Sequence, residues 1–433
     1  MRKKNYISEP SREIPIVEED DVIVCGGGPA GICAAIAAAR RGLKTRLIES
    51  QGCLGGILTS GMMSNIIDYS NKKGIIQEII SGLEKMGAKG PRCVFDIESA
   101  KYFLEKICME AGVAIRLHTS VTAAIKNERN MIEAIVTESK SGREAWKAKV
   151  FIDCTGDGDL AALAGCGFDV GREENGEVQP MSMSALIYGT KASDIGEFLR
   201  RGSDSGHKDQ LLKALEKTGN KSSYSKPTLF QLNDEAFLFM ANHEYNVPAD
   251  NAEAISKAEI SGRAEIRRHI ETLKSSGNEW KDLKIGATSS YIGVREGRRI
   301  HGLYKITVKD MEEGKEHPDT VCKSTFSVDI HSTNQEKHKG YSNEGHTVKP
   351  YDIPLRALIT KDVNNLMTAG RCISGDFYAH ASYRVVGNAA AMGEAAGYCA
   401  ALAAKMNCMP REVPWTEIAK ILDKEEAKKY AST

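Results

Sequence analysis

Three glycines near the start of the chain, spaced Gly26-x-Gly28-x-x-Gly31, carry the clearest chemical implication in the sequence. Gly26 permits a tight turn, Gly28 lets the backbone approach a pyrophosphate, and Gly31 lets a helix pack closely on a sheet. The N-terminus of that helix would offer free N–H groups and a positive dipole end to phosphates. Glu49, roughly 20 residues further on, can accept hydrogen bonds from ribose hydroxyls. The pattern predicts a dinucleotide site; the alternative is a glycine-rich helix start without a ligand.

The glycines that follow Glu49 indicate which dinucleotide binds. Gly52, Gly55, Gly56 and Gly61 suit a loop that lies close against a large ligand. A second G-x-G-x-x-G motif with its own strand and acid is absent from the sequence. We therefore expect one flavin that stays in the protein, FAD, rather than two nucleotide sites.

The elements that position this motif follow from apolar runs and helix stops. Residues 21–25 predict a buried strand, residues 29–41 a helix ended by Gly42, and residues 45–48 a second strand. Together they form one βαβ unit. Further helices are expected at 75–86 and 97–111, with an amphipathic helix at 251–276 and a small-residue helix at 385–406. An antiparallel meander is expected at 113–152, and its last residues, 150–153, return to the first sheet. Strands with long loops are expected at 312–349, and a further strand at 365–370.

Composition narrows the class of protein. The 433 residues carry 58 basic and 58 acidic side chains, so a basic nucleic-acid-binding surface is not expected. The 11 cysteines include no C-x-x-C pair, which argues against a disulfide framework, a zinc ribbon or a ferredoxin-type cluster and favours a reducing compartment. Residues 1–21 lack the apolar core of a signal peptide, and no uninterrupted apolar run of about 18 residues is present. We expect a soluble cytoplasmic protein without a membrane span.

Four blocks of sequence resemble the FAD-dependent oxidoreductases of the glutathione-reductase-like superfamily, and more narrowly a family with a single Rossmann motif. The first block is the glycine motif through Glu49, with residues 52–56 behind it. The second, residues 152–159, is similar to a strand-end Thr-Gly turn near the nucleotide, here Thr155 and Gly156. The remaining blocks are residues 293–300 with 351–356, and residues 365–371 with 380–397. The resemblance is weakest between residues 190 and 285.

The fourth block departs from the wider superfamily at one position. Many relatives carry an acid after the Ala-Gly pair that contacts the ribityl chain, whereas Arg371 follows Ala369 and Gly370 here, as in the narrower family. Asp376 is a candidate substitute, although its offset differs. Motif and resemblance together imply cofactor contacts by Gly26, Gly28, Pro29, Ala30, Gly31, Glu49, Ser50, Gly55, Gly56, Thr155, Gly156, Gly370, Arg371, Gly387, Asn388 and Ala389.

The last small-residue helix has a physical role of its own in this family-like arrangement. Its first turn, Gly387 to Ala389, is expected to point at the flavin N1–C2=O edge, where reduced flavin carries negative charge. A helix dipole and free N–H groups stabilise that charge and raise the electron affinity of flavin. Simple helix packing is the alternative explanation for these small residues.

Residues 380–388 are similar to the His-Gly-Ala-Asn-Arg stretch of fumarate reductase and aspartate oxidase. In those relatives the arginine holds a substrate carboxylate beside the flavin, which implies the same role for Arg384. A planar guanidinium is the natural bidentate partner of a carboxylate. A structural arginine that bonds backbone carbonyls explains Arg384 equally well. His380 is a candidate substrate ligand or acid–base group, with a buried structural histidine as the alternative.

Other reactive side chains have plainer explanations. Arg295 is a candidate for neutralising an acidic substrate, but ion pairing with nearby acids is favoured for at least two of Arg295, Arg298 and Arg299. A catalytic Cys53 is not expected, because disulfide reductases use a C-x-x-x-x-C pair that this sequence lacks. Tyr351 and Tyr383 are candidates for the flavin pocket, with core packing favoured. The polar segment also contains His317. A solvated loop is favoured over a metal site for its other histidines, which are His331, His338 and His346.

The expected fold is α/β. Residues 1–170 and 350–433 form a three-layer, glutathione-reductase-type FAD-binding Rossmann domain. A β-rich α+β substrate domain, residues 171–349, is inserted between these segments and covers the reactive face of the flavin. The active site is expected between the two domains. The expected function is hydride transfer between flavin N5 and a small organic substrate, with carboxylates as one candidate class and non-covalently bound FAD as cofactor. The alternative is a flavin-bearing electron-transfer subunit of a larger redox complex, which makes an external donor or acceptor protein a candidate partner. Oligomeric state is left open.

Overall fold

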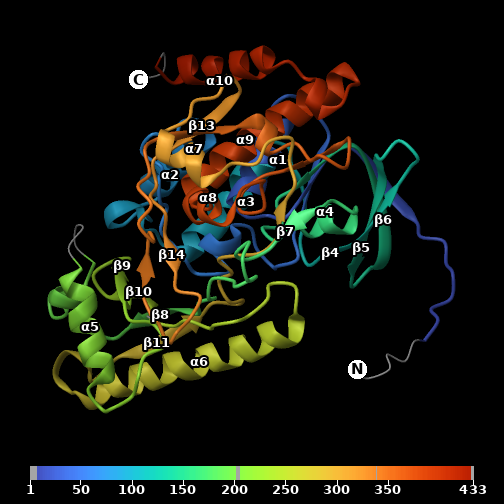
Figure 1. Cartoon of the computed structure of the whole chain (residues 1–433). Helices are drawn as coiled ribbons and strands as arrows, with labels where there is room; N and C mark the ends of the chain where they lie inside the picture. Colours follow the sequence, from blue (N-terminus) through green and yellow to red (C-terminus); the bar gives the residue numbers. More distant parts are fainter. Residues whose placement is uncertain (1–6, 201–204, 338, 431–433) are drawn as a thin grey trace.

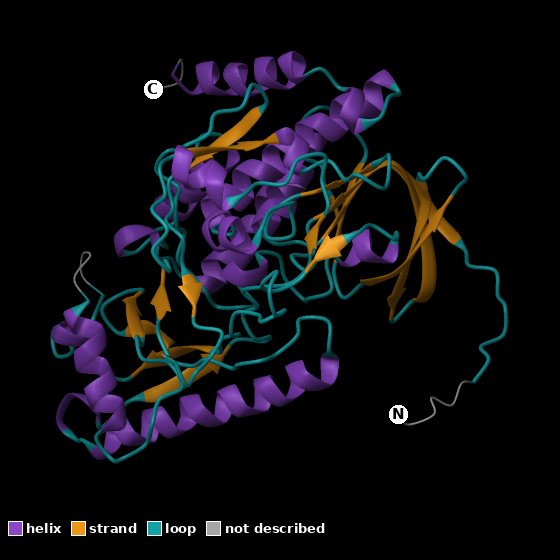
Figure 2. Ribbon diagram, viewed as in Figure 1, coloured by secondary structure: helices purple, strands orange, loops and turns teal. Residues whose placement is uncertain are grey.

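The computed structural model describes residues 7–200, 205–337 and 339–430. His338 and the first six residues of the expected tail lie outside the described residues. The fold is α/β with a parallel sheet at its core (Figure 1). Figure 2 shows most helices gathered beside that sheet, and a second, smaller sheet with its own helices at the bottom of the view. The predicted fold class is confirmed.

The central strands of the first sheet are parallel and buried on both faces. In β1 (Ile16–Cys25), Val22 and Val24 face one apolar core and Ile23 and Cys25 face another, as the two-residue period of a strand requires. The parallel strands, in spatial order, are β3 (Ala114–Arg116), β2 (Thr45–Ile48), β1, β6 (Gly142–Asp153) and β17 (Leu366–Thr368). The strand predicted at residues 21–25 is the buried end of β1.

The expected antiparallel meander is built on the first half of β6. β4 (Ser120–Lys126) pairs with β5 (Ile132–Ser139), and β5 pairs with the start of β6. The end of β6, residues 150–153, pairs with β1 and β17 instead, which confirms its predicted return to the first sheet. The prediction of a meander from residue 113 was wrong for residues 114–116, because these form the parallel edge strand β3.

Two helices of small residues cover one face of the parallel sheet. α1 (Pro29–Ala39) follows the glycine motif, and α9 (Val386–Met406) packs directly on it. Glycine permits this approach, since a Cβ at Gly393 would lie 2.0 Å from the carbonyl oxygen of Ala30. The other helices around this sheet are α2 (Ile75–Lys85), α3 (Ile97–Glu110), α4 (Asp159–Leu163), α7 (Val308–Glu313), α8 (Phe377–Tyr383) and α10 (Trp415–Tyr430). The helices predicted here are confirmed with small shifts at their ends; α4, α7, α8 and α10 were not predicted.

The second sheet, at the bottom of Figure 1, is antiparallel throughout. Its strands, in spatial order, are β11 (Lys284–Thr288), β8 (Ser184–Tyr188), β10 (Ala236–Met240) and β9 (Thr228–Gln231). The long helix α6 (Ala252–Ser275) buries Ile266, Ile270 and Leu273 in the same apolar cluster as the side chains of β10. The amphipathic helix predicted at 251–276 is therefore confirmed. The shorter helix α5 (Gly206–Glu216) packs beside it.

The segment after the second sheet returns to the first core. Ile306, Met311 and Val328 are buried in the apolar cluster that contains α1 and α9. Three short strand pairs shape this segment: β12 (Arg299–Ile300) with β7 (Phe168–Asp169), β13 (Thr320–Ser324) with β16 (Tyr351–Pro354), and β14 (Ile330–His331) with β15 (Tyr341–Ser342). The domain boundaries at 171 and 349 stay a prediction. Across the described ranges, no helix has the length and apolar character needed to cross a membrane.

Candidate active site

A cavity of about 880 Å³ reaches from the first sheet to the second. Its first-sheet end is lined by the loops that follow β1, β2 and β6, including Gly28, Glu49 and Thr155 respectively. Its second-sheet end is lined by polar side chains that include Arg295 and His331. Loops after parallel strands are the usual ligand-binding edge of an α/β sheet.

The glycine motif shapes the first-sheet end through its backbone. Gly26 has a φ of 99°, and a Cβ there would lie 2.3 Å from the carbonyl oxygen of Cys154. A Cβ at Gly31 would lie 1.8 Å from the carbonyl oxygen of Gly26. At Gly28, by contrast, no atom of the described residues lies within 4 Å of the Cβ position, and this glycine lines the cavity. The loop therefore leaves room for a pyrophosphate at the N-terminus of α1, where Pro29 and Ala30 also line the cavity.

Glu49 lies at the end of β2 and lines the cavity, as the motif predicts. Its carboxylate also holds the surrounding loops: Oε2 accepts the N–H of Gly27 at 2.6 Å, and Oε1 accepts that of Gln51 at 2.8 Å. Ser50 and Gly56 line the cavity beside it. A ribose would therefore meet a carboxylate whose position is fixed by backbone donors.

The turn after β6 brings Thr155 and Gly156 to the cavity, with Gly370 and Arg371 beside them. Arg371 donates from Nη1 to Asp157 Oδ1 at 2.6 Å. The position after Ala369 and Gly370 is thus held by an arginine in an ion pair. Asp376 does not take over that place, since its carboxylate caps α8 by accepting the N–H of Ala379 at 2.7 Å.

Four residues expected to contact the cofactor lie behind the cavity lining. A Cβ at Gly387 would lie 2.1 Å from the carbonyl oxygen of Asp68, and the buried Asn388 donates from Nδ2 to Ser324 Oγ at 3.0 Å. In the first turn of α9 it is Val386 and Ala389 that line the cavity. Gly31 and Gly55 also lie behind the lining, where they permit close packing of the loop.

Two partly buried arginines lie close together at the second-sheet end. Arg295 donates from Nη1 to the Pro180 carbonyl oxygen at 2.6 Å and to Ser182 Oγ at 2.8 Å. Burial, together with the nearby Arg384, lowers the pKa of Arg295 to about 10. Arg384 donates from Nη2 to the Asp329 carbonyl oxygen at 2.9 Å and lies 3.5 Å from Asp329 Oδ2. Both guanidinium groups line the same cavity.

His380 does not line the cavity, and of the two alternatives left open for it the structure favours the buried histidine. The residue is completely buried in α8, and neither ring nitrogen has a hydrogen-bond partner among the described residues. Burial lowers its pKa well below the usual value, so the ring is neutral. Tyr351 and Tyr383 are buried too, where their hydroxyls donate to Ser382 Oγ and to the Ile373 carbonyl oxygen.

One family model matches this chain over nearly its whole length. The model of the FAD dependent oxidoreductase family covers residues 21–422. The chain belongs to this family. FAD is therefore its cofactor, and the cavity lining at Gly28, Glu49 and the first turn of α9 fits that group.

Curated relatives of this FAD dependent oxidoreductase match it over shorter stretches. A leghemoglobin reductase from Glycine max is 62% identical over 39 residues, which are 9% of this chain and 8% of that protein. A thiamine thiazole synthase from Sulfolobus acidocaldarius is 28% identical over 160 residues, 34% of this chain and 59% of that protein. The chain thus spans under a tenth of the leghemoglobin reductase. Among solved structures, a geranylgeranyl bacteriochlorophyll reductase-like protein from Thermoplasma acidophilum is 13% identical with a TM-score of 0.46, over 94% of this chain and 84% of that chain.

Several lining residues of this oxidoreductase carry no motif in the sequence. Asp329 and His331 come from the polar segment around β14, and Tyr224 comes from the loop before β9. A weak sequence signal was available, because apolar and polar residues alternate over Val328–His331 as in a short strand. Arg298 and Arg299, in contrast, pair with Asp159 and Glu296 respectively, which confirms ion pairing for two of the three clustered arginines.

Proposed function

We propose that this oxidoreductase transfers a hydride between flavin N5 and a small organic carboxylate held by Arg295 and Arg384. When bound, FAD supplies the two-electron chemistry. The observation that carries the proposal is the pair of partly buried arginines that line one cavity, beyond the end lined by the glycine motif. Guanidinium groups bind carboxylates through two parallel hydrogen bonds.

The charges at the second-sheet end support an anionic substrate. Arg200 and Lys208 line the cavity together with Arg295 and Arg384, whereas Asp329 is the acid among them. Within the described part of the chain, Arg295 forms no ion pair, and its hydrogen bonds go to neutral oxygens. Asp329 is the opposite charge near Arg295, but it lies 3.5 Å from Arg384. A bound carboxylate would give Arg295 a direct partner and offset part of its desolvation.

The chain's own residues would orient the reaction. Val386 and Ala389 line the cavity at the N-terminus of α9, where the helix dipole favours negative charge on the bound cofactor. Arg295 is held by Pro180 and Ser182, so its position does not depend on the substrate. A guanidinium that is fixed before binding loses little conformational freedom when the carboxylate arrives.

The test is anaerobic reduction or reoxidation of the purified flavoprotein by a panel of small carboxylates and their methyl esters. We expect one carboxylate class to change the visible flavin spectrum and its ester to fail. Arg295→Ala should lower kcat/KM about 10²- to 10³-fold, as expected for removal of one partner of a buried charge pair. Arg384→Ala should act in the same direction, with flavin content unchanged in both variants.

The matched control is Arg263→Ala, which removes an exposed arginine of α6 that pairs with Glu259. Its kinetics should equal those of the wild type. Equal activity on carboxylates and esters, or unchanged kinetics in Arg295→Ala, would contradict the carboxylate proposal. A flavin that no small molecule reduces or reoxidises would favour the electron-transfer alternative.

A further inference from the structure

A row of hydrogen-bonded side chains leads away from the second-sheet end of the cavity. His331 Nε2 lies 3.4 Å from Asp329 Oδ2, and His331 Nδ1 lies 2.9 Å from His243 Nε2. His243 Nδ1 lies 3.2 Å from the hydroxyl of Tyr245. We call these four residues the histidine chain. Asp329 and His331 line the cavity, whereas Tyr245 lies away from it and is only partly buried.

The histidine chain can hold its protons in two arrangements. In the first, the Tyr245 hydroxyl donates to His243 Nδ1, His243 Nε2–H donates to His331 Nδ1, and His331 Nε2–H points at Asp329 and the cavity. In the second, Tyr245 donates to the Ser223 carbonyl oxygen, 3.0 Å away, and both histidines carry the proton on Nδ1. Each neutral imidazole has one donor and one acceptor, so both arrangements satisfy the bonds between the rings.

The two arrangements differ by the passage of one proton along the chain. When His331 Nε2 gives up its proton, His331 Nδ1 takes one from His243 Nε2, and His243 Nδ1 takes one from Tyr245. The tyrosine regains a proton from solvent and then donates to Ser223. The net result is one proton moved from solvent to the cavity, and the reverse sequence removes one.

The surroundings keep both rings neutral, as this exchange requires. Burial and the nearby Arg295 lower the pKa of His331 to about 4, against the opposing effect of Asp329. Burial, Arg295 and His331 lower the pKa of His243 well below its usual value. Tyr224 and Tyr341 also face the rings, and Arg384 adds a further positive charge that lowers the pKa of His331. Lys208 lies over the Tyr341 ring.

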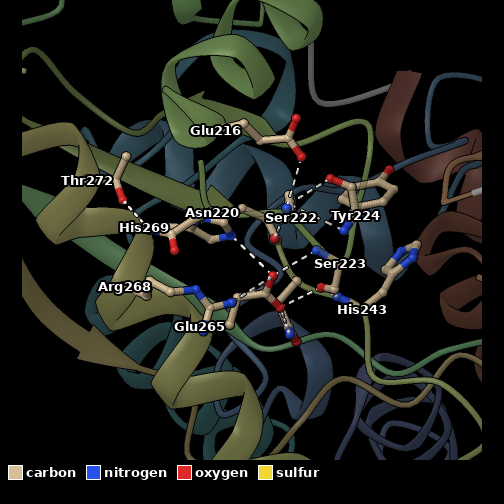
Figure 3. Close-up of polar contacts among 12 residues, drawn as sticks. Glu216, Asn220, Ser222, Ser223, Tyr224, His243, Glu265, Arg268, His269 and Thr272 are labelled. Carbon is tan, nitrogen blue, oxygen red and sulfur yellow. Dashed lines mark hydrogen bonds and ion pairs between the residues drawn. The ribbon is translucent and has the colours of Figure 1, made fainter. Parts of the chain in front are cut away.

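A second network of hydrogen bonds holds His243 in place (Figure 3). Glu265 on α6 accepts the N–H of Ser223 at 2.8 Å and also the Ser223 hydroxyl. The same hydroxyl accepts the backbone N–H of His243 at 2.8 Å, and the Tyr224 ring packs on the His243 ring with centroids 4.0 Å apart. The backbone that carries His243 is therefore tied to the long helix.

We propose that His331 is the catalytic acid–base of the reaction, exchanging a proton with the substrate through Nε2, and that His243 and Tyr245 relay this proton to the partly exposed end of the histidine chain. The inference rests on the proposed function, since hydride transfer to or from an organic substrate leaves one proton to be supplied or removed. For each hydride that moves between flavin and substrate, one N–H bond of His331 breaks or forms.

The kinetic test compares His331→Gln, His243→Gln and Tyr245→Phe with the wild type. We expect His331→Gln to lower kcat about 10²-fold or more with KM and flavin content unchanged, as for loss of a general acid–base. His243→Gln and Tyr245→Phe should lower kcat less, by about tenfold, and flatten the dependence of kcat on pH and on deuterated solvent. The matched controls are His301→Gln, which removes a histidine paired with Asp169 away from the cavity, and Tyr188→Phe, which removes an exposed tyrosine of β8. Both controls should behave as the wild type.

Nitrogen-15 NMR of the imidazole rings in the wild-type protein gives a readout that needs no substrate. We expect His243 and His331 to be neutral at pH 7, and Tyr245→Phe to change the tautomer of His243. Doubly protonated rings, unchanged tautomers in Tyr245→Phe, or a wild-type kcat in His331→Gln would overturn the relay. If the NMR result holds but esters react as well as carboxylates, the carboxylate proposal fails and the relay stands.

Discussion

The two ends of the cavity are built by different means. At the first-sheet end the shape comes from the backbone, because Gly26 and Gly31 sit where a Cβ would collide with carbonyl oxygens and Gly28 opens directly on the cavity. At the second-sheet end the shape comes from polar side chains, such as Arg295 and His331, that reach the cavity from separate segments. The difference teaches that a short local motif can shape one end of a cavity, whereas the other end depends on the assembly of distant segments.

Two buried carboxyl groups, one beside each sheet, have pKa values shifted in opposite directions. Burial raises the pKa of Asp153, at the end of β6, to about 6, despite N–H donors from Ala161 and Thr155. Burial also raises the pKa of Glu265 on α6, but hydrogen bonds from His269 and Ser223, among others, outweigh it and lower the pKa to about 2. Asp153 therefore adds stability as the pH falls from about 6 towards 3.8, whereas the stability from Glu265 is lost as the pH falls from 4.5 towards about 2.

The largest expected effect separates two glycines of one motif. Gly31→Ala should lower the free energy of unfolding by about 3 kcal/mol, because the added Cβ overpacks the turn against Gly26. Gly28→Ala should leave that free energy unchanged and weaken FAD binding at least about tenfold, which is about 1.4 kcal/mol. Denaturant titration of the apoprotein and flavin titration measure the two effects. Wild-type FAD affinity in Gly28→Ala would contradict the claim that the backbone at Gly28 shapes the first-sheet end of the cavity for the cofactor.

A smaller effect tests the side-chain network of the second sheet. Between pH 6 and pH 3, the wild type should lose about 2 kcal/mol of unfolding free energy relative to Glu265→Gln. The reason is that the Glu265 carboxyl takes up its proton at a higher pH in the unfolded chain than in the folded protein. Denaturant titrations at both pH values measure this difference. Glu271→Gln, at an exposed position of the same helix, is the control and should parallel the wild type. A gap independent of pH would show that the Glu265 carboxylate is not held as described.

The smallest effect concerns a side chain at the backbone-built end. Cys53 lies in the glycine-rich loop, with its Sγ 3.1 Å from Ser60 Oγ. Because side chains contribute little chemistry there, Cys53→Ser should change kcat by less than about twofold, or about 0.4 kcal/mol. Steady-state rates with the preferred substrate provide the measurement. A large loss of kcat would place thiol chemistry at the first-sheet end and contradict the contrast.

The sequence predicts the local parts of this molecule well. The βαβ unit with its motif and the helix of Gly387 and Gly393 follow from spacing and apolar periodicity, which act over a few residues. The histidine chain was not predictable in this way, since His243 and His331 meet through the packing of distant segments. For His380 the sequence left substrate contact and burial open, because the burial of α8 is a property of the whole fold.

The packing of α9 on α1 has a consequence for how the protein is made. Ribosomes add roughly 5–20 residues per second, so α1 emerges on the order of tens of seconds before its partner helix. During that interval α9 is not yet available to pack on the small-residue face of α1, although the glycine motif before α1 has already been synthesised. Ala389 of α9 also lines the cavity, so the cofactor pocket is finished only late in synthesis. The part of the site that is encoded first is therefore among the last to become functional.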